Sequence, residues 1–136
     1  MNVVSQSLAG LPAFLLYFLL GLALLAAFVA IYVRVTPYRE ITLIREGNTA
    51  AAISLSGAIL GFVLPVASAI AHSVGVIDMI VWSVIALIAQ SIAYMIVSRL
   101  VPHFADAIRA GRVAGATLLA SIAVGVGILN AASMTY

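Results

Sequence analysis

Four long apolar runs, with no charged residue in their interior, constrain the fold of this chain more than any other feature. They cover Leu11–Val33, about 50–71, about 76–97 and 113 to about 134. At 1.5 Å rise per residue, a helix of about 20 apolar residues crosses the hydrocarbon core of a bilayer. Hydrophobic residues make up 65% of the chain and charged residues 7%, whereas about 25% of a soluble domain is charged. The sequence therefore predicts an all-α integral membrane protein with four transmembrane helices, in a single transmembrane domain over residues 1–136.

The two halves of the chain are similar, and each contains one charged loop between two apolar runs. Each loop, at 34–49 and at 98–112, contains Arg, Pro, an aromatic residue, an acidic residue, Ile and Arg in that order, followed by a glycine. The register that places Gly47 on Gly111 continues into the apolar runs that follow. Self-similarity of this kind indicates a duplicated unit, and two copies with the same orientation are related by a pseudo-two-fold axis along the membrane normal. We expect two tandem hairpin repeats, at about 11–71 and about 76–134.

The first loop has the pattern of a short amphipathic helix. Its apolar residues recur at every third position, at Tyr38, Ile41 and Ile44. Its charged residues fall mostly on the opposite side, and they are Arg39, Glu40, Arg45 and Glu46. This pattern is typical of a helix that lies on the membrane surface with its charged side chains in water. We predict one short amphipathic segment in each loop.

All six basic residues are arginines, and all of them lie in or beside the two long loops. They are Arg34, Arg39, Arg45, Arg99, Arg109 and Arg112. Neither the polar lead at 1–10, nor the short turn at 72–75, nor the end of the chain carries Lys or Arg. Because positive charge collects in short cytoplasmic loops, the prediction is that both long loops are cytoplasmic and that the N- and C-termini lie outside.

The second apolar run carries a stripe of small and polar residues on one helical face. The members follow one another at steps of three or four, and they are Ser54, Gly57, Gly61, Pro65, Ser68 and His72. The pair Gly57 and Gly61 lets helix backbones approach closely, so the stripe favours helix packing. Pro65 frees the carbonyl of Gly61, and an open carbonyl beside polar side chains also suits a small-solute site. Both interpretations stay open.

The third run adds polar residues of its own, chiefly Gln90 and Tyr94. Counting from Arg99 at 1.5 Å per residue places Gln90 about 13 Å from the cytoplasmic end, level with Gly57 to Gly61. A buried amide at that depth needs hydrogen-bond partners. Gln90 therefore either joins helices or lines a wet path.

The sequence contains no arrangement of residues that is typical of a catalytic or metal-binding site. The chain has no cysteine, and the topology puts His72 and His103 on opposite sides of the membrane, so they do not share a metal. No serine is accompanied by a buried histidine and a carboxylate that could activate it as a nucleophile. No phosphate loop or nucleic-acid stripe is present. We predict no enzyme activity, no cofactor, no metal and no nucleic-acid partner.

One long stretch resembles a known family. It reads TPYREITLIREGNTAAAISLSGAILGFVLPVASAIAHS, and a Gln-bearing third run and a final LNAASMT follow it. These residues are similar to the YjfL-like family of small bacterial inner-membrane proteins, whose domain has no known function. The resemblance covers nearly the whole chain. It implies a four-helix inner-membrane protein with a duplicated hairpin, and it supplies no catalytic or ligand residues.

Two functions are compatible with these features. The favoured one is a homo-oligomer in the lipid bilayer whose Ser54, Gly61, Ser68 and Gln90 surfaces form a narrow polar path for a small solute or ion. The alternative is a structural membrane scaffold that docks a cytoplasmic or membrane protein partner through its arginine-bearing loops, in envelope maintenance. No Asp, Glu, Lys or Arg lies deep in a span, which argues against a self-sufficient pump.

Overall fold

The computed structural model describes residues 2–72 and 74–134, and these residues form seven helices and no strand. The helices are α1 (Val3–Ala9), α2 (Leu11–Val35), α3 (Glu40–Arg45), α4 (Thr49–His72), α5 (Val76–Leu100), α6 (Phe104–Arg109) and α7 (Val113–Ser133). Four stretches are long and apolar enough to span a membrane: Val3–Val35, Thr49–His72, Val76–Leu100 and Val113–Ser133. The prediction of an all-α protein with four transmembrane helices is confirmed.

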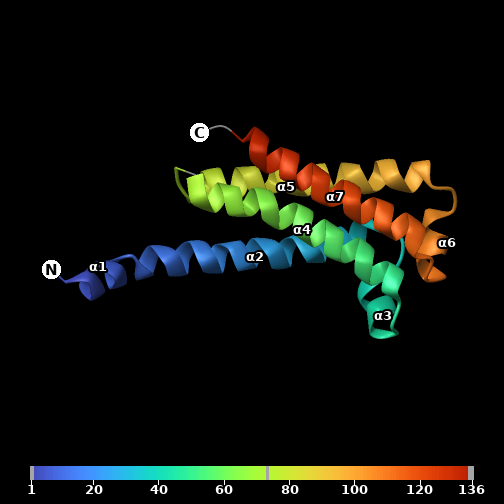
Figure 1. Ribbon diagram of the computed structural model, residues 1–136, viewed down its shortest axis with the longest axis horizontal. Coiled ribbons are helices and arrows are strands. Elements are labelled where there is room, and N and C mark those ends of the chain that lie inside the picture. The colour runs from blue at the N-terminus through green and yellow to red at the C-terminus, as the bar shows by residue number, and fades with distance from the viewer. Residues whose placement is uncertain (1, 73, 135–136) are drawn as a thin grey trace.

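The helices α4, α5 and α7 form the core, and α2 joins them near its C-terminal end (Figure 1). Both termini and the connection between α4 and α5 lie at one end of the molecule, and the short helices α3 and α6 lie at the other (Figure 1). The predicted turn at 72–75 falls at that first end, although its Ser73 lies outside the described residues. The first end is called the turn end below, and the second end the loop end.

The polar lead before the first run is itself helical, which the sequence pattern did not indicate. Asn2 caps α1, since the Ser5 amide donates to its side-chain oxygen at 2.8 Å. Gly10 separates α1 from α2. Pro12 lies in the first turn of α2, where its missing N–H leaves no bond unmade.

Only part of α2 contacts the rest of the molecule. Its buried residues are Phe28 and Tyr32, and the Phe28 ring stacks on Phe62 of α4 with centroids 4.3 Å apart. Toward the N-terminus, Phe14 and Phe18 are exposed and stack on each other. Exposed apolar side chains of this kind have no cost in hydrocarbon, so α2 is suited to extensive lipid contact.

The helices α3 and α6 end in the same way. Gly47 and Gly111 follow them with φ of 88° and 78°, a conformation that glycine adopts without strain. The amide of Asn48 then bonds to Leu43 O, and the amide of Arg112 to Ala107 O, both at 2.9 Å. These bonds satisfy carbonyls that the helix end leaves free, and they turn the chain sharply into α4 and α7.

Candidate functional site

The small residues of α4 lie against α7. A Cβ atom built on Gly57 would overlap Ala120, and one on Gly61 would overlap Ala123. On the facing helix, a Cβ atom on Gly127 would overlap the backbone of Gly61. The two backbones are therefore in direct contact, an arrangement that brings van der Waals packing without large side chains. We call these five residues the α4–α7 seam.

Gln90 reaches into this seam from α5. Its side chain is buried, and its Nε2 donates to the carbonyl oxygen of Ala123 at 3.0 Å. A Cβ atom on Gly61 would strike the same amide nitrogen, so Gln90 lies at the level of the glycine. Its Oε1 is buried and has no hydrogen-bond partner. The amide thus joins α5 to α7 with one bond, and one acceptor is left over.

The other stripe residues are distributed along the whole of α4. Ser54 is buried and donates to the Ala51 carbonyl within its own helix at 3.1 Å. Pro65 is buried inside the helix, and Ser68 is half-buried. His72 is exposed at the turn end, where its Nδ1 lies 3.0 Å from the Ser68 carbonyl. The stripe therefore runs from the loop end to the turn end, and its middle is covered by α7.

Tyr94 belongs to a different group of side chains, at the loop end. Its ring centroid lies 6.1 Å from that of Tyr32, 6.4 Å from that of Tyr38 and 6.0 Å from that of Phe104. These residues come from α2, the following turn, α5 and α6. Aromatic rings at these distances attract one another edge to face. Tyr94 therefore connects four segments of the chain.

A carboxylate lies among these rings, contrary to the sequence prediction. Glu40 was expected on the water-facing side of its loop, yet only 1% of its surface is exposed. The reason is that α3 begins only at Glu40. Residues 36–39 precede it outside any helix, and the chain bends at 36–38, so helical spacing does not decide which of these side chains face the core. Thr36, Tyr38 and Glu40 point inward, while Pro37 and Arg39 are exposed.

Glu40 makes a single short hydrogen bond. The Thr36 hydroxyl lies 2.6 Å from its Oε1, and its Oε2 is buried with no partner. Burial raises the pKa of Glu40 to about 7, and the Thr36 bond lowers it to a lesser extent. Burial also raises the pKa of Tyr38, and the carboxylate adds to that shift. We call this group the loop-end cluster: Tyr32, Thr36, Tyr38, Glu40, Tyr94 and Phe104.

The two loops are hydrogen-bonded to each other. The side-chain amide of Asn48 donates to the Ile108 carbonyl at 2.8 Å, and Arg109 donates to the Pro37 carbonyl at 2.9 Å. The Oδ1 of Asn48 also accepts from the Ala51 amide at 2.9 Å and so caps α4. A shallow hollow of about 340 Å³ lies between the loops, with Arg39 and Arg109 among its lining residues. The six arginines singled out in the sequence are all exposed.

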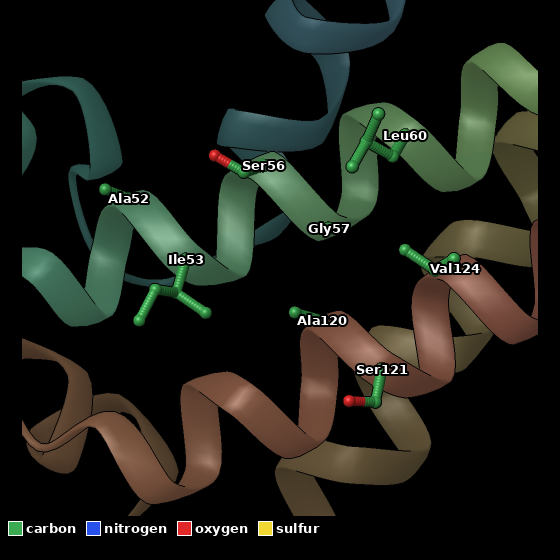
Figure 2. Close-up of a pocket in the computed structure, with 8 residues that line it drawn as sticks. All are labelled: Ala52, Ile53, Ser56, Gly57, Leu60, Ala120, Ser121 and Val124. Carbon is green, nitrogen blue, oxygen red and sulfur yellow. The ribbon is translucent and has the colours of Figure 1, made fainter.

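A second hollow, of about 540 Å³, lies on the outer side of the α4–α7 seam (Figure 2). Its walls are mostly small or aliphatic, and they comprise Ala52, Ile53, Ser56, Gly57, Leu60, Ala120, Ser121 and Val124. The hydroxyl groups of Ser56 and Ser121 point away from each other (Figure 2). The hollow is therefore suited to van der Waals packing more than to hydrogen bonding.

No group of three or more His, Asp or Glu side chains suited to a metal occurs in the described parts of the chain. Asp78, in the first turn of α5, accepts from the Val74 amide at 3.4 Å. The ion pair between Arg109 and Asp106, at 3.3 Å, is exposed.

Comparison with known proteins agrees with the helical architecture. Residues 6–134 match the family model described as Domain of Unknown Function (DUF350). The chain belongs to this family. It is 36% identical over 129 residues to the UPF0719 inner membrane protein YjfL of Escherichia coli K12, covering 95% of this chain and 98% of that protein. The protein of the same name in Escherichia coli O157:H7 matches equally well. No solved structure matches. The predicted membership of the YjfL-like family is confirmed.

The sequence analysis missed Thr36, Tyr38 and Glu40 as a buried group. The residue types gave no clear signal, because the three buried positions hold a polar, an aromatic and a charged side chain. Pro37, which disfavours helix at the residue before it, indicates only that the helical period is interrupted there.

Proposed function

We propose that this protein is a non-enzymatic inner-membrane scaffold, and that its two arginine-bearing loops form one cytoplasmic docking surface for an acidic segment of a partner protein. The observation that carries the proposal is the pair of hydrogen bonds between the loops, from Asn48 to Ile108 and from Arg109 to Pro37. Segments from opposite halves of the chain are thereby held as a single platform. A rigid platform loses little conformational entropy when it binds.

The chemistry of the platform suits carboxylates. Arg39 and Arg109 line the hollow between the loops, and Glu46 is the one acidic residue in its wall. The planar guanidinium group binds a carboxylate through two parallel hydrogen bonds, which gives direction as well as charge attraction. An acidic peptide offers several carboxylates in a row, which match the planar guanidinium groups of both arginines at once. We therefore favour the peptide.

The orientation of the proposed scaffold follows from the arginines. The loop end holds α3 and α6 and is the end expected in the cytoplasm, and both termini would then lie outside. Their common position at the turn end is compatible with this topology (Figure 1). A reporter fused after Tyr136, which lies outside the described residues, should therefore give an external signal. A cytoplasmic signal would place the two loops outside, away from a cytoplasmic partner, and would contradict the proposal.

We also propose that the platform arose from a duplicated hairpin. The matching chain reversals at Gly47 and Gly111 support this. So does the close packing of α4 on α7, the last helix of each half. The loops would then be equivalent elements about a pseudo-two-fold axis along the membrane normal. Asn48 occupies the position of Arg112 in the other half, so the platform is not symmetric in its hydrogen bonds.

Site-specific photo-cross-linking tests the scaffold. A cross-linking residue at Arg45, which is exposed on α3, should capture a protein with an acidic segment, and the same residue at Val74, at the turn end, should not. The synthetic segment should then bind the protein in nanodiscs of zwitterionic lipid. The double variant Arg39→Glu with Arg45→Glu should weaken this binding at least tenfold. Capture of lipid alone at Arg45, or binding unaffected by charge reversal, would contradict the proposal.

A polar path is the second candidate function. It is favoured by the buried Gln90 Oε1, which lacks a partner, and by Pro65, which lies inside α4. The path would pass beside the α4–α7 seam, because α7 covers the middle of the stripe. Liposomes that pass a small solute, with flux abolished by Gln90→Leu and kept by Ser91→Ala, would favour the path over the scaffold. Ser91 is a suitable control because it donates only to Leu87 of its own helix.

The expected homo-oligomer would use the hollow over the seam (Figure 2). Small residues at Ala52, Ser56 and Ala120 permit close approach by a helix of a second copy, the preferred contact between helices in membranes. Replacing Ser56 with Phe would fill the hollow and should convert oligomers to monomers in nanodiscs. If the assembled state is unchanged, copies associate elsewhere or not at all.

A further inference from the structure

Glu40 is enclosed without the groups that normally stabilise a buried carboxylate. Its exposed fraction is 1%, and Oε2 has no hydrogen-bond donor. Within residues 2–72 and 74–134, no Arg or His nitrogen lies within ion-pair distance of it. A carboxylate that is removed from water without a cation or donors has a high free energy, and such a group usually takes up a proton instead.

The hydrogen bonds of Thr36 point to the same state. Its Oγ1 lies near three oxygens, at 2.6 Å from Glu40 Oε1, 3.2 Å from Val33 O and 3.4 Å from Tyr38 O. A hydroxyl group has one proton to donate. If Glu40 is ionised, Thr36 must donate to it, and the Val33 carbonyl at the end of α2 loses its bond. If Glu40 carries a proton on Oε1, it donates to Thr36, and the hydroxyl proton of Thr36 stays with Val33.

We propose that Glu40 is a proton-binding site, in which the neutral carboxyl donates to the Thr36 hydroxyl and locks the corner between α2 and α3 onto the helix core. Loss of the proton to bulk water leaves a carboxylate that the cluster does not solvate. The carboxylate then moves out to water, and Thr36 and Tyr38 are released with it. The site would thus couple cytoplasmic pH to the position of α3.

The neighbours of Glu40 support this assignment. Tyr32 faces it from α2, Tyr38 from the turn and Tyr94 from α5, and all three hydroxyls are uncharged groups within electrostatic range of the carboxyl group. From α4 the neighbouring group is the neutral Ser54, which lies beside Tyr38. From α6, Arg109 is held by Asp106 and the Pro37 carbonyl.

No cation therefore balances the carboxylate within the described residues. Burial raises the pKa of Glu40 to about 7, so the site titrates near neutral pH.

Infrared spectroscopy can detect this proton directly. The chain has only four acidic side chains, and the other three are Glu46, Asp78 and Asp106, none of which is buried. A carboxylic-acid carbonyl band should disappear from the protein in nanodiscs as the pH rises through about 7. Glu40→Gln should remove the band, and Glu46→Gln, at an exposed glutamate of the same loop, should keep it.

A further variant keeps the test decisive even if Glu40→Gln does not fold. The triple variant Glu46→Gln, Asp78→Asn and Asp106→Asn leaves Glu40 as the only acidic side chain. It should retain the band and its titration. Absence of a titrating band in both the wild type and the triple variant would overturn the proposal, and so would a band that survives Glu40→Gln.

Hydrogen–deuterium exchange tests the coupling. After correction for intrinsic rates, amides at 36–48 should exchange about tenfold faster one pH unit above the Glu40 pKa than well below it. Glu40→Gln should abolish this difference, because its neutral amide donates to Thr36 at every pH. Exchange independent of pH in the wild type would refute the release of α3. These outcomes are independent of whether the loops dock a partner.

Discussion

The α4–α7 seam and the loop-end cluster bring helices together by opposite means. In the seam, three glycines allow backbones to touch, and Gln90 supplies one interhelical hydrogen bond. At the loop end, large rings surround a carboxyl group whose only bond is to Thr36. The seam thus depends on glycines, which have no side chain, whereas the cluster depends on large rings brought together where the chain bends between α2 and α3. The difference suggests a rigid centre and a pH-sensitive end.

The largest effect should come from adding one methyl group to the seam. Gly61→Ala would place a Cβ atom against Ala123 and Gln90, and overpacking of this kind costs about 1–3 kcal/mol. Gly125→Ala, at the corresponding position of α7, meets nothing within 4 Å and should be neutral or stabilising by up to about 1 kcal/mol, because alanine favours helix. Thermal unfolding in detergent measures both. Equal effects would mean that the two helices are not in backbone contact.

The second-largest effect should be a dependence of the free energy of unfolding on pH. It should arise from Glu40 in the loop-end cluster and not from the seam. The folded-state pKa of Glu40 is raised from 4.5 to about 7, so the folded protein binds this proton more tightly than the unfolded protein. The contribution is complete below about pH 4.5 and is lost as the pH rises to about 7. At 1.36 kcal/mol per pKa unit, the upper bound is about 3 kcal/mol.

The measurement for this effect is the difference in free energy of unfolding between wild type and Glu40→Gln across that pH range. The difference removes the contributions of the other acidic residues. A constant difference from pH 4.5 to 7 would mean that Glu40 titrates normally.

A smaller effect is expected where the two loops meet. Asn48→Ala removes the cap of α4 and the bond to Ile108, and loss of such a cap costs about 0.5–2 kcal/mol. Arg112→Ala, at the corresponding place before α7, has no side-chain cap to lose. Chemical denaturation in mixed micelles should therefore separate the two variants by about 1 kcal/mol. If they are equally stable, the bond between the loops contributes nothing.

The smallest effect should come from Gln90→Leu in the seam. The substitution removes the bond to Ala123 and also the unpartnered Oε1, and interhelical hydrogen bonds in membranes average about 0.6 kcal/mol. A change within about 1 kcal/mol of wild type is expected in the same unfolding assay. A loss of unfolding free energy several times larger would indicate that the Gln90 amide organises the helix core. The seam would then depend on a polar side chain, as the loop-end cluster does.

Much of the fold follows directly from the order of residues. Apart from the start of the first span, which lies at Val3 and not at Leu11, the spans were predicted to within about three residues at each end, since long apolar runs have one low-energy form in a bilayer. The reversals at Gly47 and Gly111 were recognisable for a similar reason, because glycine tolerates positive φ. Gln90 and Gly61 could be placed at one depth because the rise of a helix is constant.

The sequence by itself determined where the four long apolar helices lie and which residues on each are small. Only the tertiary structure decided that α7, rather than a second copy or water, lies on the face of Gly57 and Gly61. It also decided that Glu40 is buried, because that depends on the point at which the chain between α2 and α3 leaves and re-enters the helical conformation. Helix periodicity is local and can be read from residue spacing. The partner of a helix face and the direction of a bent connection depend on contacts between residues far apart in the chain.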